Sequence, residues 1–319
     1  MEEFFLGVDG GQSSTTALIA DRAGRVLGSA SGGAFNHAGA AEGREKFVRA
    51  ISETVAAALS EAGFDYRAVE FAGACLGCSG GPDDKLPIVE ELLRSARLVV
   101  TTDAAIALSG ATAGEPGIVA IAGTGSIAYG RNARGQTARA GGWGYVFGDE
   151  GGAFDIVRRA LRAVLRAAEG WGPETALGEA LLRATAARSP NELMHAFYTA
   201  EYSRARIASF APLVDAAARQ GDAAARTILD EAAAELAQLA GAVHRQIFEP
   251  RTPVRVAYIG GVFRSDLLLE SFRKLVHRDL AGSRCEPPIY GPAGGALLEA
   301  YRAAGIAPPR LSDLPPFKT

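Results

Sequence analysis

Two stretches of this sequence follow the same plan, in which an apolar strand runs into a glycine-rich turn and a second strand follows. The first turn is Asp9-Gly10-Gly11-Gln12-Ser13, and the second is Gly123-Thr124-Gly125-Ser126. Their residue-by-residue similarity is weak, but an internal duplication of a strand–turn–strand unit would place the two turns face to face across a cleft. Alternation of such strands with helical patterns predicts an α/β protein.

The length and composition of the chain are those of a globular protein with two cores. It has 319 residues, of which 48% are hydrophobic and 22% are charged, and a typical domain has about 100–200 residues. Its 33 Lys and Arg nearly balance its 36 Asp and Glu, which gives a net charge of −3. No long-range field therefore favours nucleic acid or an anionic membrane. We expect a small-molecule partner, no nucleic acid and no membrane.

The cysteines and the start of the chain indicate a reducing, cytoplasmic setting. Three cysteines cannot form a closed disulfide framework, and the strand-like residues 4–8 stand where a secretory leader would lie. No run reaches the ~18 apolar residues that a membrane span needs. Cys75 and Cys78 have the spacing of redox and metal sites. Because no second pair exists, we interpret them as buried small hydrophobic residues.

The order of the elements predicts two domains, the second enlarged by helices. The expected helices are 42–62, 84–95, most of 155–248 and 294–304, and the expected strands include 69–78, 98–102 and 254–259, after a hairpin at 15–31. Pro173, Pro190 and Pro212 indicate helix starts. The expected domains are 1–111 completed by 294–319, and 112–293.

Both turns suit a phosphate chain, because glycines let backbone N–H groups approach an anion without interference from Cβ. The predicted phosphate contacts are Gly10, Gly11, Gln12 and Ser13 in the first turn, and Thr124, Gly125 and Ser126 in the second. Asp9 has the chemistry to hold Mg²⁺, which usually takes only one or two carboxylates. The alternative is an ordinary hairpin turn. Neither turn is a Walker A loop, because no Gly-Lys-Ser/Thr follows.

Two further glycine groups suit close packing against a flat adenine and its ribose. They are Gly260 with Gly261, directly after the strand 254–259, and Gly291 with Gly294 and Gly295. Taken singly, each group is also compatible with a turn.

Asp103 is the candidate general base. It directly follows the apolar run 98–102, where a buried parallel strand would pass into a helix. A carboxylate at such a strand end can accept the proton of a substrate hydroxyl as the phosphoryl group arrives. Asp is also a favoured helix N-cap, and the residues alone leave both functions open.

The loop 141–152 holds candidate sugar contacts. It combines glycines, large aromatic side chains and adjacent carboxylates, which suit a polyhydroxylated ring. The alternative is a helix start capped by Asp149. Asn36 and His37 lie between the hairpin and the first long helix, and by themselves they indicate nothing.

In this order, the motifs resemble the N-acetylglucosamine kinase branch of the ATPase group that contains the benzoyl-CoA reductase and hydroxyacyl-CoA dehydratase activators. The resemblance spans nearly the whole chain. It implies the two-domain ribonuclease H-like fold of sugar kinases, heat-shock chaperone ATPases and actin, with an interdomain cleft, and the use of ATP and Mg²⁺. It also implies phosphate contacts at both turns, the catalytic function of Asp103 within Thr101 to Ala104, and sugar contacts at Asn36, His37, Gly142, Trp143 and Asp149.

The activity that the resemblance implies is ATP-dependent phosphorylation of an amino sugar, N-acetylglucosamine to its 6-phosphate, by a homodimer. N-acetylmuramic acid and glucosamine are alternative substrates. A different alternative is an ATPase that activates a redox enzyme, but such activators hold an iron–sulfur cluster with two cysteines from each subunit, and Cys75 with Cys78 would be an unusual placement. A non-catalytic sugar sensor is the third alternative.

Overall fold

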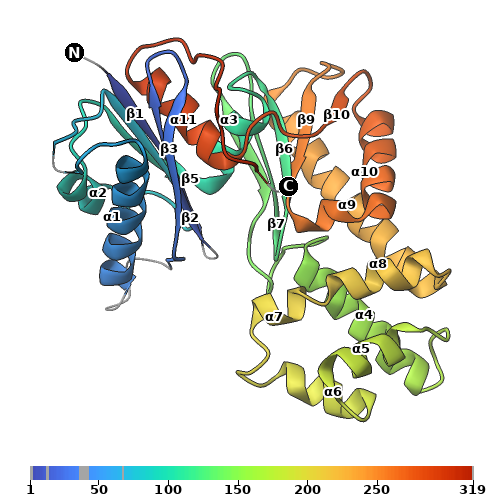
Figure 1. Ribbon diagram of the computed structural model, residues 1–319. Coiled ribbons are helices and arrows are strands. Elements are labelled where there is room, and N and C mark those ends of the chain that lie inside the picture. Colours follow the sequence, from blue (N-terminus) through green and yellow to red (C-terminus); the bar gives the residue numbers. More distant parts are fainter. Residues whose placement is uncertain (1–2, 12–13, 36–42, 67, 318–319) are drawn as a thin grey trace. The chain divides into compact units, whose positions relative to one another are not determined.

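The structure is a computed structural model that describes residues 3–11, 14–35, 43–66 and 68–317 (Figure 1). The chain divides into two compact units. Unit 1 comprises Met1–Gly117 with Pro287–Lys318, and unit 2 comprises Ile118–Glu286 with Thr319. The boundaries predicted from the sequence fall at 111/112 and 293/294, and the assignment of the units as separate domains stays a prediction.

Unit 1 is built on a five-stranded mixed sheet with the strand order β3-β2-β1-β4-β5. The strands are β1 (Phe4–Gly10), β2 (Thr15–Asp21), β3 (Val26–Gly32), β4 (Gly73–Cys78) and β5 (Leu98–Thr102). β1, β4 and β5 run parallel, whereas β2 is antiparallel to both β1 and β3. The carboxyl ends of β1, β4 and β5 therefore meet at one edge, where α/β sheets bind their ligands.

Helices cover both faces of this sheet, because β1 is apolar on both sides. Phe4, Leu6 and Val8 join one buried cluster with α1, and Phe5 joins another with α11 on the opposite face. The helices of unit 1 are α1 (Gly43–Glu61), α2 (Leu86–Leu92), α3 (Asp103–Ala111) and α11 (Pro292–Ala303). Gly7 lets α11 approach closely, since a Cβ there would lie 2.5 Å from the backbone nitrogen of Leu297.

Glycines also let α11 pack on α3. A Cβ on Gly295 would lie only 1.9 Å from the carbonyl oxygen of Ile106, and side chains of unit 1 likewise back Gly291 and Gly294. Gly295 thus has a function in helix packing, whereas Gly291 and Gly294 pack against side chains outside the helices, those of Tyr290, Leu311, Leu314 and Phe317. The structure gives no support to the interpretation of these glycines as adenine contacts. α11 begins at Pro292 rather than at 294, because proline is well suited to the first turn.

Unit 2 holds a second five-stranded sheet, with the order β10-β9-β6-β7-β8. Its strands are β6 (Gly117–Ala122), β7 (Ser126–Arg131), β8 (Thr137–Gly141), β9 (Arg255–Ile259) and β10 (Arg284–Glu286). β6, β9 and β10 run parallel, and β7 and β8 are antiparallel. Counted along the chain within each unit, both sheets have the order third, second, first, fourth, fifth. This shared order agrees with the duplication that the two glycine turns suggest.

Most of unit 2 outside its sheet is helical, which confirms the helical pattern predicted for 155–248. The helices are α4 (Ala153–Ala168), α5 (Leu177–Thr185), α6 (Pro190–Phe197), α7 (Arg204–Ala208), α8 (Ala211–Arg219) and α9 (Ala223–Ile247), followed after β9 by the 3₁₀ turn η1 (Gly261–Arg264) and α10 (Asp266–Asp279). α9 packs against β7, β8, α8 and α10, and places Leu229 and Leu236 in the core. Pro190 and Pro212 lie in first helical turns, whereas Pro173 precedes α5 by four residues.

Two predicted elements are shorter in the structure. β4 starts at Gly73 instead of 69, because Phe71 forms only an isolated bridge with Ser95, and α2 covers only the centre of the predicted helix 84–95. Within the described ranges, no helix combines the length and the apolar character needed to cross a membrane.

Candidate functional site

Asp103 lies where β5 passes into α3, at the carboxyl edge of the sheet of unit 1. The N-cap of α3 is Thr102, whose Oγ accepts a hydrogen bond from the backbone N–H of Ala105 at 3.2 Å. The alternative function of Asp103 as the N-cap therefore does not apply. Its carboxylate is free to make other contacts at the edge.

Two hydrogen bonds orient the carboxylate of Asp103. The hydroxyl of Ser79 donates to Oδ2 at 2.7 Å, and the backbone N–H of Ala104 donates to Oδ1 at 2.8 Å. Ser79 directly follows β4, and its own N–H donates to the carbonyl of Gly10 at the end of β1. Sequence reasoning missed Ser79. The signal was present, because a polar residue directly after the strand next to β5 has the same placement as Asp103.

Asp9 lies one residue before the end of β1 and is only partly exposed. Its pKa is raised to about 7, mainly because burial disfavours the charged form and also because Asp103 lies nearby. In the described part of the chain, no group of three or more His, Cys, Asp or Glu could hold a metal ion by itself. Two neighbouring carboxylates nevertheless fit Mg²⁺, which needs only one or two when phosphates and water complete its shell.

The first glycine turn is described only in part. Gly10 is required by packing, since a Cβ there would lie 2.4 Å from the ring of Phe35. The N–H of Gly11 donates to the carbonyl of Ser14 at 3.0 Å, which closes the turn. The predicted phosphate contacts Gln12 and Ser13, and the predicted sugar contacts Asn36 and His37, lie outside the described residues.

The second turn joins β6 to β7 and rests on the start of α4. The N–H groups of Ala153 and Phe154 donate to the carbonyls of Gly123 and Thr124 at 2.9 and 3.1 Å. In the described ranges, the N–H groups of Thr124 and Gly125 have no hydrogen-bond partner. Two adjacent backbone donors without partners suit an anion such as phosphate.

Ser126 differs from its neighbours in the turn because its donors are already used. Its hydroxyl donates to the carbonyl of Glu150 at 2.6 Å, and its N–H donates to Oδ1 of Asp149 at 3.3 Å. The side chain is buried. In this structure Ser126 ties the turn to the loop 141–152.

The loop 141–152 presents one exposed aromatic residue and one buried carboxylate among the predicted sugar contacts. Trp143 is 64% exposed, and the guanidinium of Arg139 lies 4.7 Å from its ring centre. Gly142 has φ of +72° and donates its N–H to the carbonyl of Ser126. Asp149 is 4% exposed. The N-cap of α4 is Gly152, so the alternative of Asp149 as a cap does not apply.

The carboxylate of Asp149 is held by a cation that sequence reasoning missed. Arg204, the first residue of α7, donates from Nη2 to Oδ2 of Asp149 at 2.5 Å. Nothing in the sequence distinguishes Arg204 from the many other arginines of the helical segment. Only the folded chain brings it to the second turn.

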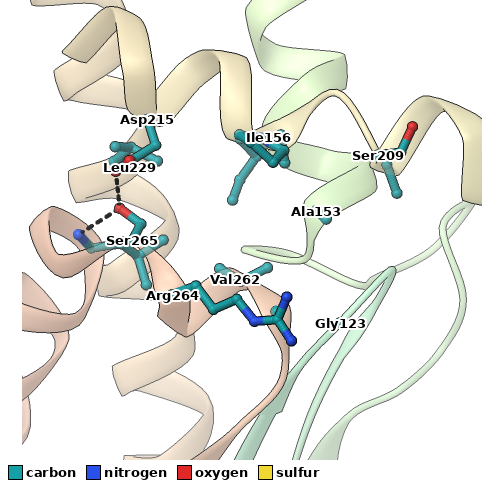
Figure 2. Close-up of a pocket in the computed structure, with 14 residues that line it drawn as sticks. Gly123, Ala153, Ile156, Ser209, Asp215, Leu229, Val262, Arg264 and Ser265 are labelled. Carbon is teal, nitrogen blue, oxygen red and sulfur yellow. Dashed lines mark hydrogen bonds between the residues drawn. The ribbon is translucent and has the colours of Figure 1, made fainter. Parts of the chain in front are cut away.

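A cavity of about 410 Å³ opens beside the second turn (Figure 2). Its walls come from the turn itself and from α4, α7, α8, α9, η1 and α10. Gly123 and Gly261 line it, and neither has an atom within 4 Å of the place where a Cβ would lie. Ile156 supplies apolar surface, and Asp215 accepts a hydrogen bond from the hydroxyl of Ser265. The volume and the mixed lining are typical of a small-molecule site.

Of the predicted pair Gly260 and Gly261, the first has a structural function. Gly260 has φ of +118°, and a Cβ there would lie 2.3 Å from the carbonyl oxygen of Ala122. It therefore lets η1 start directly against β6. Gly261, the next residue, faces the cavity.

Cys75 and Cys78 are buried on opposite faces of the sheet. Cys75 packs with Ile106 and Ala296, whereas Cys78 belongs to the cluster on the α1 side. Burial raises the pKa of the Cys75 thiol and that of Cys78, the latter to about 12. The interpretation of both as buried small hydrophobic residues is confirmed, and their two sulfur atoms do not share a side of β4.

Comparison with known proteins gives relatives over most of the chain. An N-acetylmuramic acid/N-acetylglucosamine kinase of Clostridium acetobutylicum is 33% identical over 282 residues, which cover 86% of this chain and 90% of the relative. An N-acetyl-D-glucosamine kinase of Dictyostelium discoideum is 30% identical over 321 residues, covering 93% and 98%.

Solved structures agree with the predicted fold class. A structure from Chromobacterium violaceum, provisionally described as an N-acetylglucosamine kinase, has a TM-score of 0.75 and 30% identity, and the match covers 93% of this chain and 98% of that one. A ROK family glucokinase from Streptomyces griseus shares the fold at a TM-score of 0.55 and 21% identity, covering 96% and 100%. The model of the BadF/BadG/BcrA/BcrD ATPase family matches residues 6–300. This chain is therefore an α/β protein of the ribonuclease H-like fold and belongs to the BadF/BadG/BcrA/BcrD ATPase family.

Proposed function

We propose that this protein transfers the γ-phosphoryl group of ATP to the 6-hydroxyl of an amino sugar, N-acetylglucosamine in the first place. The names of the curated relatives support this proposal, since both are amino-sugar kinases that match most of the chain. One fold can host many activities, so the residues of the site must also support this one.

The observation that carries the proposal is the cavity of unit 2 and its continuity with the second turn. Gly123 belongs to both, and the next two residues, Thr124 and Gly125, present N–H groups without partners in the described ranges. An adenosine group in the cavity would have its phosphates directed along these donors. Backbone donors at a turn and a largely apolar pocket are what a nucleotide needs.

In unit 1, Asp103 is the proposed general base. Its two oxygens accept hydrogen bonds from Ser79 and Ala104, which hold the carboxylate in one orientation for the proton of the sugar hydroxyl. Asp9 would hold Mg²⁺, directly or through water, with Asp103 nearby. When bound, Mg²⁺ neutralises charge on the phosphates. The first turn, with Gly10, Gly11, Gln12 and Ser13, is the second proposed phosphate contact.

The proposed sugar contacts are Asn36, His37, Gly142, Trp143 and Asp149. In support, Trp143 offers an exposed aromatic face, and the carboxylate of Asp149 has lone pairs beyond those used by Ser126 and Arg204. Gly260 and Gly261 are proposed to shape the nucleotide site. The homodimer, the cytoplasmic location and the use of Mg²⁺ stay predictions.

N-acetylmuramic acid is the second candidate substrate, because the relative from Clostridium acetobutylicum is named for both sugars. Glucosamine differs from N-acetylglucosamine only in its free amine and stays an alternative. The redox-activator alternative has less support, since Cys75 and Cys78 lie on opposite faces of β4.

The test is ADP release from ATP and Mg²⁺ with N-acetylglucosamine, N-acetylmuramic acid, glucosamine, N-acetylmannosamine or glucose, and without sugar. We expect strong turnover with one amino sugar and almost none without sugar. ATP hydrolysis at the same rate with and without sugar would support the alternative of an activator ATPase. Absence of any turnover, with sugar binding retained, would support the sensor.

A further inference from the structure

Arg204 and Asp149 form an ion pair that is mostly shielded from water. The side chain of Asp149 is 6% exposed and that of Arg204 is 32% exposed, and Nη2 and Oδ2 are 2.5 Å apart. The guanidinium also lies 5.5 Å from the ring centre of Tyr145 in the loop 141–152. A carboxylate buried this deeply needs such a partner, because an uncompensated buried charge is strongly unfavourable.

The pair packs directly on the second turn. A Cβ on Gly125 would lie 2.4 Å from Oδ2 of Asp149 and 2.6 Å from Nη2 of Arg204. Asp149 also accepts the N–H of Ser126, the next residue of the turn. In a close-packed site with no room for one carbon atom, the ion pair and the turn cannot shift independently.

Two features indicate that stability alone does not explain this arrangement. Asp149 has φ of +64°, a conformation that costs energy for a residue with a Cβ and persists where surrounding contacts enforce it. Nε of Arg204 is buried without a hydrogen-bond partner in the described structure. A strained residue and an unsatisfied buried donor in one ion pair are more typical of a functional site than of an optimised core.

The helix that carries Arg204 also forms part of the cavity wall. α7 has five residues, a length of about 7 Å. Arg204 at its start contacts Asp149, whereas Ala208 at its end and Ser209 after it line the cavity, where Figure 2 labels Ser209. One short helix and the residue that follows it therefore touch both the proposed sugar contact and the proposed nucleotide pocket.

We propose that Arg204 is a positioning residue, which acts through Asp149 to fix the second turn and through α7 to link occupation of the cavity to the loop 141–152. This inference rests on the proposed function. It assigns Arg204 an effect on the kinetics of transfer and on the coupling between nucleotide and sugar. A purely structural ion pair would change only the stability of the fold.

The proposal for Arg204 is tested by the variants Arg204→Gln and Arg204→Lys, with Arg206→Gln and Arg206→Lys as matched controls. Arg206 lies on the same helix, but it pairs with Glu201 at the surface. We expect Arg204→Gln to raise KM for the sugar about tenfold and to lower kcat about tenfold, and each of these two changes is equivalent to about 1.4 kcal/mol. Arg204→Lys recovers part of this loss, because lysine keeps the charge but not the planar fork. The Arg206 variants stay within about twofold of the wild type.

Coupling is measured as the ratio of AMP-PNP affinities with and without N-acetylglucosamine. We expect the sugar to tighten AMP-PNP binding in the wild type and in Arg206→Gln, and the ratio to fall to about one in Arg204→Gln. Arg204→Gln should also add nothing to the kinetic loss of Asp149→Asn in the double variant.

The outcomes distinguish a failure of the proposed function from a failure of the function assigned to Arg204. A wild-type protein without sugar-dependent turnover would refute the proposed function. If the wild type is active, either of two results would refute the function of Arg204. In the first, Arg204→Gln has the kinetics and the coupling ratio of Arg206→Gln. In the second, the losses of Arg204→Gln and Asp149→Asn are additive in the double variant. If Arg204→Gln does not fold, Arg204→Lys compared with Arg206→Lys decides by the same criteria.

Discussion

Units 1 and 2 have the same strand order, but they place different chemical groups at their first glycine-rich turns, carboxylates in unit 1 and backbone N–H donors in unit 2. In unit 1 the turn after β1 needs Gly10 to make room for the ring of Phe35, and the carboxylates of Asp9 and Asp103 gather nearby. In unit 2 the turn after β6 needs Gly125 to make room for an ion pair, and the N–H groups of Thr124 and Gly125 have no hydrogen-bond partner in the described ranges. The same glycine-rich turn is therefore required for different reasons in the two units.

This difference between the two turns indicates how two units with the same strand order can contribute different groups to one phosphoryl transfer. Acidic groups suit the hydroxyl that must lose a proton and the metal that accompanies ATP. Backbone donors and a cation suit phosphate oxygens. We infer that unit 1 carries the acid–base chemistry and unit 2 carries most of the nucleotide recognition.

The largest expected effect belongs to Asp103→Asn, which keeps the size of the side chain but removes the base. We expect kcat to fall by about 10²–10⁴-fold, the usual contribution of general base catalysis. Sugar and nucleotide binding, measured by calorimetry, should stay near wild type. Asp279→Asn is the control, since that carboxylate pairs with Arg278 on the surface. Near-normal turnover of Asp103→Asn would show that Asp103 is not the general base.

A pair of glycine substitutions separates packing from binding in the second turn. Gly125→Ala places a methyl group against Asp149 and Arg204, so we expect the free energy of unfolding to fall by about 1–3 kcal/mol. Gly123→Ala places its methyl group in open space at the cavity. Its unfolding should match that of the wild type, while its affinity for AMP-PNP falls. Urea denaturation and calorimetry measure the two quantities, and equal losses in both variants would contradict the distinction.

The third expected effect concerns stability rather than catalysis, and it is a pH dependence that arises from Asp9. The folded protein holds this proton up to about pH 7, whereas an ordinary aspartate releases it near 3.8. Between these values the folded state binds more protons than the unfolded state, so the free energy of unfolding falls as the pH rises from about 4 to 7, and then levels off. Asp9→Asn lacks this contribution.

Urea denaturation of the wild type and of Asp9→Asn at pH 5 and pH 8, without Mg²⁺, measures the effect. Asp9→Asn should become more stable relative to the wild type at pH 8 than at pH 5. A stability difference that does not change with pH would show that Asp9 titrates normally. Asp279→Asn again serves as the control, because Arg278 lowers the pKa of Asp279.

Local sequence patterns predicted the secondary structure of this protein better than its tertiary contacts. The placement of Asp103 followed from an apolar strand that ends in a polar residue, and the helical content predicted for 155–248 followed from composition and periodicity. Gly295 was misinterpreted, because only tertiary structure decides whether a glycine faces a ligand or a neighbouring helix. Arg204 could not be found at all, since its partner Asp149 lies 55 residues away in the sequence.

The position of α11 has a consequence for how the chain folds as it is synthesised. Phe5 and Leu18, near the start of the chain, are buried against Leu297 and Tyr301, near its end. The sheet and the core of unit 2 lie within residues 117–286, so the ribosome releases all of them before α11 has been made. The part of the first sheet around Phe5 and Leu18 therefore lacks the covering helix α11 throughout most of translation. Unit 1 is therefore completed only after unit 2 has been made, and a chain truncated before Pro292 would expose the apolar surface around Phe5 permanently.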